Sequence, residues 1–199
     1  YTLSWAGGTG SNDNTGYRIS WLGGNDPTFT SPMTFDQRHT GSLSIDYRTG
    51  ARSMLPLFGA NILMRFGSGL RYTPSKPRTA VFGGQLSDQP VAGLNSGVMP
   101  ATFNIDLRLD KAFVISGVNL GLFCVVKNVL NSQNVSAVYN YSGLPDNDGY
   151  LTTQAGQNWL NDWASGGPEA GQDLYTSRIT SPSRWGTPRQ VQIGLRVDL

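Results

Sequence analysis

The chain has 199 residues, a net charge of +2 at pH 7, 14% charged residues and 38% hydrophobic residues. A net charge this small gives no indication of nucleic-acid binding. The chain has a single cysteine, Cys124, so it cannot form an internal disulfide. No run of 18 apolar residues occurs, which excludes a transmembrane helix. The 25 glycines and the single glutamate, Glu169, argue against helices.

Six β-strands are predicted, because apolar residues recur at every second position in six segments. In chain order these segments cover residues 1–6, 35–48, 60–73, 103–110, 119–130 and 187–199. The last segment is the most informative, since its odd positions are apolar and its even positions are polar from Gln190 onward, and the alternation is cleanest in residues 103–110. Side chains of a strand alternate between its two faces, so each predicted strand has one apolar and one polar face.

The connections between these strands alternate in length. Long polar segments cover about residues 7–34, 74–100 and 131–186, and short links lie near residues 50–59 and at Gly117. Short turns at one rim and long loops at the other are typical of outer-membrane barrels. We therefore expect the long loops outside the cell and the short turns in the periplasm.

The polar faces of the predicted strands carry charges of both signs. Burying these charges in a dry core would cost several kcal/mol per ion, whereas lining a water-filled lumen costs little. The pattern thus favours an antiparallel transmembrane β-barrel, with Phe103, Ile105, Leu107 and Leu109 facing lipid. The alternative is a soluble sheet with one solvated face. The predicted lumen-facing residues are Asp36, Arg38, Asp46, Arg48, Arg65, Arg71, Asp106, Arg108, Asp110, Arg196 and Asp198.

Candidate sites outside the strands are few. Trp159, Asp162 and Trp163 in the longest loop could stack on and hydrogen-bond to a ligand, or pack the loop on itself. Asp146 and Asp148 have spacing that resembles a calcium loop, but such clusters are also ordinary turns, so no metal site is predicted. His39 is interpreted as a rim contact. With no catalytic constellation in the sequence, we expect neither an enzyme nor a cofactor.

Five motifs, in order, resemble the C-terminal part of the barrel of TonB-dependent outer-membrane receptors. They are residues 35–39 (FDQRH), 66–74 (FGSGLRYTP), 127–131 (KNVLN), 148–151 (DGYL) and 184–196 (RWGTPRQVQIGLR). The resemblance implies that residues 1–199 are the last six or so strands of a barrel of about 22 strands, the size typical of plugged outer-membrane transporters. It also implies that the N-terminal plug domain lies outside these residues.

The function implied by this resemblance is import of a scarce solute across the outer membrane of a Gram-negative bacterium. The implied partners are outer-membrane lipid, the remaining segments of the barrel, and a TonB-type energy-coupling protein that acts through the plug. Two alternatives stay open. One is a structural or surface-interaction barrel without transport, and the other is a soluble, secreted β-sandwich that binds glycans.

Overall fold

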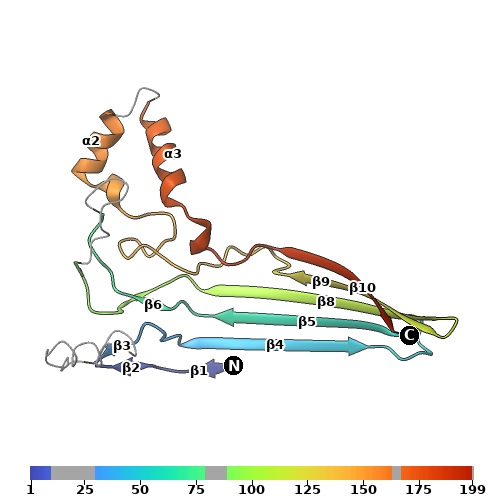
Figure 1. Cartoon of the computed structure of the whole chain (residues 1–199). Coiled ribbons are helices and arrows are strands. Elements are labelled where there is room, and N and C mark those ends of the chain that lie inside the picture. Colours follow the sequence, from blue (N-terminus) through green and yellow to red (C-terminus); the bar gives the residue numbers. More distant parts are fainter. Residues whose placement is uncertain (10–29, 79–88, 163–166, 199) are drawn as a thin grey trace, which may run out of the picture.

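The structure is a computed structural model, and it describes residues 1–9, 30–78, 89–162 and 167–198 (Figure 1). Antiparallel strands make up most of its regular structure, as predicted. Among the described residues, helices occur only between the last two strands. The strands are β1 (Thr2–Leu3), β2 (Gly7–Gly8), β3 (Ser31–Pro32), β4 (His39–Arg48), β5 (Phe58–Gly67), β6 (Arg71–Tyr72), β7 (Gly97–Val98), β8 (Thr102–Ile115), β9 (Val118–Lys127) and β10 (Gln190–Asp198). The helices are η1 (Tyr150–Thr152), α2 (Gln154–Asp162), α3 (Pro168–Ile179) and η3 (Pro182–Arg184).

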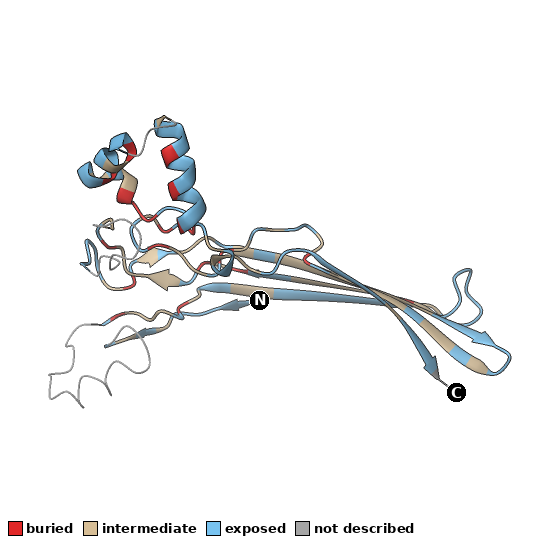
Figure 2. Cartoon of the chain, turned by 45° about the horizontal axis from the view of Figure 1, so that its top comes forward, coloured by how far each residue is buried: buried red, intermediate tan, exposed pale blue. Residues whose placement is uncertain are grey.

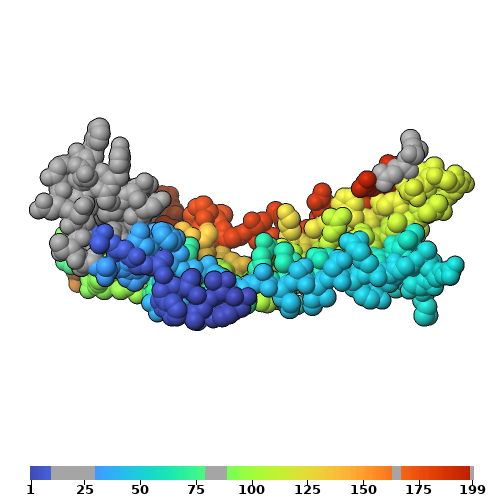
Figure 3. Space-filling model, turned by 90° about the horizontal axis from the view of Figure 1, so that it is seen from below, coloured from blue at the N-terminus to red at the C-terminus, as the bar shows by residue number. Residues whose placement is uncertain are grey.

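Six of the strands form one antiparallel sheet in the order β1-β4-β5-β8-β9-β10. Each of β5, β8, β9 and β10 therefore pairs with the long strand that precedes it in the chain, and β4 pairs with the short β1. The short connections β4–β5 and β8–β9 lie at one end of the sheet, and the long connections lie at the other (Figure 1). This confirms the predicted alternation of short turns and long loops. Seen in the space-filling view, the molecule is bowed along its length (Figure 3).

The register divides the sheet into two faces of opposite character. One row of paired residues crosses five strands and is entirely apolar: Ile45, Ile62, Leu107, Val126 and Val191. The next row lies on the other face and is mainly polar: Asp46, Asn61, Arg108, Val125 and Gln192. We call these the apolar face and the polar face. The prediction that Phe103, Ile105, Leu107 and Leu109 share one apolar face is confirmed, because all four lie on the apolar face of the sheet.

The apolar face is not covered by any other part of the described chain. Ile193 is 71% exposed and Leu195 is 65% exposed. The other two sheets, β2-β3 and β6-β7, have two strands each. Within the described residues the fold is thus neither a closed barrel nor a sandwich with a dry core between two sheets. In soluble monomers a contiguous exposed apolar patch of this kind marks an interaction surface.

The buried core of the described chain lies in the segment predicted to be a polar loop, and that prediction was wrong for residues 150–162 and 167–184 (Figure 2). We call residues 139–162 and 167–184 the helical cap. The Thr153 hydroxyl accepts a hydrogen bond from the Gly156 N–H and so caps α2, and Pro168 begins α3. Tyr139, Tyr150, Tyr175 and Ile179 form its core.

No helix in the described ranges has the length and hydropathy needed to cross a membrane.

Several predicted strands are shorter than expected. The first, predicted over residues 1–6, is reduced to Thr2–Leu3. Residues 35–38 precede β4, and residues 68–70 separate β5 from the small strand β6. Asp36, Arg38 and Arg71 therefore do not lie in the six-stranded sheet, in contrast to the prediction. The physical reason is that Asp36 is buried with Arg71 and fastens the loops to one another instead of continuing the strand.

Candidate functional site

The polar face of the six-stranded sheet carries the largest group of predicted site residues. Asp46 and Arg48 of β4, Arg65 of β5, and Asp106, Arg108 and Asp110 of β8 all share this face by register. Arg196 lies opposite Gly121, which belongs to the same face. Asp198 pairs through its backbone with Asn119. The structure thus places on one face the charged residues that the alternation within each strand predicted to share a face.

Asp106 is the most connected carboxylate of the polar face. Its Oδ2 lies 2.5 Å from Arg65 Nη2, and its Oδ1 accepts a hydrogen bond of 2.9 Å from the Asn128 N–H. Asn104 Nδ2 donates to the same Oδ1 at 3.1 Å. Asp106 therefore links β5, β8 and the residue that follows β9. The sequence shows the charge at Asp106 but gives no sign of its bond to Asn128.

A second group of ions lies on the polar face next to the short turns. Arg48 Nε lies 3.0 Å from Asp46 Oδ2, and Arg48 Nη1 lies 3.5 Å from Asp110 Oδ2. Arg108 Nε lies 3.7 Å from Asp110 Oδ1. The two arginines remain more than half exposed, so solvent screens the pairs and they contribute little to stability. The face is charged, hydrated and paired, which suits contact with water.

Lys111 is the exception on the apolar face, where it lies opposite Phe58. Its ammonium group contacts the Pro56 carbonyl in the β4–β5 turn and lies 5.4 Å from the centre of the Phe113 ring. A lysine at the end of an apolar surface can reach a polar boundary in this way. We did not predict this residue, although the adjacent charges Asp110 and Lys111 break the alternation and could have revealed it.

Asp36 forms a separate cluster at the loop end of the sheet. Its carboxylate lies 3.0 Å from Arg71 Nε and 3.6 Å from Arg38 Nε, and it accepts a hydrogen bond of 2.9 Å from the Ala6 N–H. Burial alone would raise the pKa of Asp36, but the Ala6 hydrogen bond and the two arginines together hold it below its ordinary value. This cluster fastens three loop segments and is structural in character.

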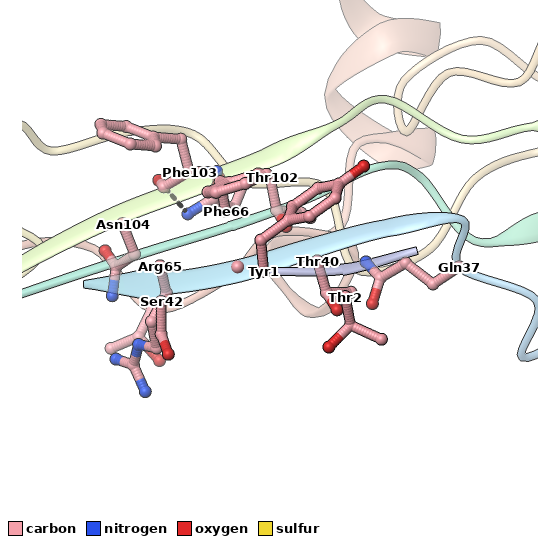
Figure 4. Close-up of a pocket in the computed structure, with 14 residues that line it drawn as sticks. Tyr1, Thr2, Gln37, Thr40, Ser42, Arg65, Phe66, Thr102, Phe103 and Asn104 are labelled. Atoms are coloured by element: carbon pink, nitrogen blue, oxygen red, sulfur yellow. Dashed lines mark hydrogen bonds between the residues drawn. The ribbon is translucent and has the colours of Figure 1, made fainter. Parts of the chain in front are cut away.

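A hollow of about 570 Å³ lies where β1, β4, β5 and β8 meet at the loop end. Its lining residues point to both sides of the strands, with Tyr1, Phe66 and Phe103 on one side and Thr2, Thr40, Ser42, Arg65 and Asn104 on the other (Figure 4). One side thus presents aromatic rings, and the other presents hydroxyl, amide and guanidinium groups. This is the same separation into an apolar and a polar face that the rest of the sheet shows. The hollow therefore belongs to the rim and does not enclose a single ligand site.

His39 lies on this rim. The Tyr1 hydroxyl and His39 Nδ1 are 2.8 Å apart, and the two rings stack with centroids 6.2 Å apart. Its backbone N–H donates to Ser68 Oγ at 3.0 Å. These contacts support the interpretation of His39 as a rim residue. The described residues contain no group of three or more potential metal ligands of the His, Cys, Asp or Glu type.

The candidate ligand residues of the longest loop lie in the helical cap. The Trp159 ring packs edge-on against Tyr175, with centroids 5.5 Å apart, so it belongs to the core of the cap. Asp162 is exposed at the end of α2. Trp163 lies outside the described residues. Of the two described residues, Trp159 thus lies in the core of the cap and Asp162 lies in solvent.

Asp148 and Asp146 have different surroundings despite their spacing. Asp148 is buried; its Oδ2 accepts a hydrogen bond of 2.7 Å from the Tyr175 hydroxyl and lies 3.5 Å from Arg78 Nη1. Burial, together with the bond to the Asp148 carboxylate, raises the pKa of Tyr175. Asp146 is exposed. Since Asp148 is already bound by a phenol and a guanidinium, it serves the fold of the cap.

Comparison of the chain with protein-family models, with curated proteins and with solved structures found no match in any of the three.

Proposed function

We propose that this chain is part of the wall of a plugged, TonB-dependent transporter in the outer membrane of a Gram-negative bacterium, and that this transporter imports a scarce solute. The observation that carries the proposal is the division of the sheet into an exposed apolar face and a hydrated, ion-paired polar face. In a transmembrane barrel the apolar face contacts lipid and the polar face lines the lumen.

The lengths of the strands support the proposal. The five long strands have 9 to 14 residues, and a strand needs ~9–11 residues to cross a bilayer. Lys111 then lies at the periplasmic end of the apolar face, where its contact with the Pro56 carbonyl keeps the ammonium group out of hydrocarbon. The remaining strands of the barrel and the plug would come from outside these residues.

The proposal can be tested by ion conduction through the full-length protein in a planar bilayer, with the plug unfolded by urea. An open passage lined by the polar face should conduct ions. Replacing two lumen arginines (Arg48→Gln with Arg108→Gln) should shift the reversal potential in a KCl gradient toward cation selectivity, because it removes positive charge from the lumen. Lys111→Gln is the control, since it removes one positive charge from the apolar face.

Two results would contradict the proposal. If Lys111→Gln changes selectivity as strongly as the arginine variant, the two faces have been assigned wrongly. If urea opens no conducting path in a protein that is stably inserted, the barrel is a surface scaffold without transport.

A further inference from the structure

The helical cap contains a hollow of about 470 Å³ between α2, α3 and the turn at residues 144–148. This volume falls within the range of ~300–1,000 Å³ found for small-molecule sites. The hollow is separate from the polar face and from the rim hollow, and none of the sheet strands lines it. The described residues that line it lie between Leu144 and Ile179 in the chain.

The residues that line this hollow are of two chemical kinds. The apolar lining is formed by Leu144, Leu151, Leu160 and Ile179, and the polar lining includes Asn147, Thr152, Gln157, Gln172 and Thr176. Amides and hydroxyls both donate and accept hydrogen bonds. A surface that combines such groups with aliphatic carbon matches a solute with hydroxyls around a hydrocarbon ring.

Three side chains of the lining are available to a ligand. Within the described chain, the side chains of Asp146, Gln172 and Thr176 make no hydrogen bond or ion pair, and all three are exposed. Asp148, by contrast, lies 3.5 Å from Arg78 and accepts the Tyr175 hydroxyl. The ligand would therefore meet one unpaired carboxylate, a primary amide and a hydroxyl at the mouth of the hollow.

The charge of the hollow excludes one class of solute. None of the described residues that line it is a lysine or an arginine, and Asp146 adds a negative charge without a partner among them. An anionic ligand would be repelled and would find no charge-assisted donor. A neutral polyol experiences no such repulsion, and its hydroxyls can donate to the carboxylate.

We infer that this hollow binds a neutral saccharide of one or two rings, with hydroxyls held by Asp146, Gln172 and Thr176 and ring C–H groups against the leucines. The inference deepens the proposed function by naming a solute class, and only the import of that solute rests on the proposed function. Binding itself requires only the folded cap, so the two can fail independently.

Maltose and cellobiose are suitable neutral probes, and digalacturonate is a suitable anionic one. Each would be titrated into the detergent-solubilised full-length protein up to the millimolar range, and the heat of binding and the tryptophan fluorescence would be measured. Trp159 packs against Tyr175, which lines the hollow, so at least one neutral saccharide should produce heat and change the fluorescence. Trp159→Phe should reduce the fluorescence change and leave the heat of binding.

The matched variants lie side by side on α3. Gln172→Ala with Thr176→Val removes hydrogen-bonding groups from the lining, and we expect the Kd to rise by about tenfold or more. Asp173→Ala with Ser177→Ala changes the next two positions, which do not line the hollow, and should leave the Kd unchanged. All four positions are exposed, so the variants should fold.

Three outcomes would overturn the inference: neither neutral saccharide binds, the lining variant binds as tightly as the control variant, or digalacturonate binds more tightly than the neutral probes. None of these outcomes would affect the assignment of the sheet faces, which the conduction experiment tests separately.

Discussion

Asp36 differs from the carboxylates of the polar face because it is buried. Its side chain is 2% exposed, and Arg71 beside it is 10% exposed, whereas the ion pairs of the sheet retain water. Removing one partner of a buried pair leaves the other charge without compensation, which costs more than the loss of an exposed pair. Asp36 therefore matters for the stability of the loop end of the sheet.

Asp36→Ala should destabilise this cluster by about 3 kcal/mol, because Arg71 would remain buried without its carboxylate. Amide hydrogen exchange of Ala6, whose N–H donates to Asp36, would report the change as a faster exchange rate. Asp46→Ala is the control, since Asp46 is 45% exposed and its loss should alter exchange little. Equal effects of the two substitutions would show that Asp36 has no special role.

The pH dependence of this cluster follows from the lowered pKa of Asp36. A carboxyl whose pKa is lower in the folded state than in the unfolded state stabilises the fold above its unfolded value of ~3.9. The stabilisation is lost as the pH falls through the lower folded pKa. Protection of the Ala6 amide, corrected for the intrinsic pH dependence of exchange, should thus be constant at neutral pH and decrease only in strong acid. A decrease between pH 6 and 8 would contradict this assignment.

The side chains of the sheet could be assigned to faces from the sequence, whereas those of the loops could not. Arg48, Arg65 and Arg108 obey the alternation of a strand, which depends only on local geometry. Asp36 and Arg71 are 35 positions apart, and their contact depends on how two loops meet. Alternation contains no information on such a contact.

The helical cap depends on a small polar core. Tyr175, which is fully buried, stacks on Tyr150 with ring centroids 5.5 Å apart and donates to Asp148. Arg78, from the loop that follows β6, pairs with the same carboxylate. The cap is thereby fastened to a second loop, so its position depends on contacts between the two.

Tyr175→Phe should destabilise the cap by about 2 kcal/mol, because it removes a hydrogen bond to a buried carboxylate and keeps the ring in place. Hydrogen exchange of the α3 amides would measure the loss. Tyr141→Phe is the control, since Tyr141 is exposed and its hydroxyl makes only a contact of 3.4 Å with Thr152 Oγ1. An unchanged rate in Tyr175→Phe would show that the phenol contributes nothing.

The helices of the cap were missed because glycine was counted as an argument against them. Gly156 and Gly171 lie inside α2 and α3, where they permit close approach. A Cβ at Gly156 would collide with the Tyr150 carbonyl, and one at Gly171 would lie 3.2 Å from Leu160 Cδ2. Local signals were present, since Pro168 and Glu169 begin α3 and Arg178 lies in its last turn.

The orientation of the chain in the membrane can be tested with single cysteines in a Cys124→Ser background. Asp162→Cys in the cap should react with a membrane-impermeant maleimide in intact cells if the long loops face outward, as we propose. Ser53→Cys in the β4–β5 turn should react only after the outer membrane is permeabilised. Labelling of residue 53 before residue 162 would reverse the orientation.

At the scale of the whole molecule, the sheet has two edges, at β1 and β10. In lipid, unpaired N–H and C=O groups at such edges cost several kcal/mol each, so neighbouring strands must satisfy them. Six strands are also fewer than the eight of the smallest known outer-membrane barrels. A closed barrel in the membrane would therefore need further strands beside these two edges. The alternation of short and long connections followed from the sequence, whereas closure of a barrel depends on contacts that the described strands do not make.

We expect the apolar face to contact lipid and the polar face to contact water. Nitroxide labels at Leu107 and at its neighbour Arg108, which lie on opposite faces of β8, test this expectation most directly. The labelled protein would be the full-length protein in liposomes, with Cys124→Ser to remove the native thiol. The label at 107 should collide mainly with dissolved oxygen, and the label at 108 mainly with a water-soluble nickel chelate. A label at 107 that collides with the nickel chelate while the label at 108 is shielded from it would contradict the account.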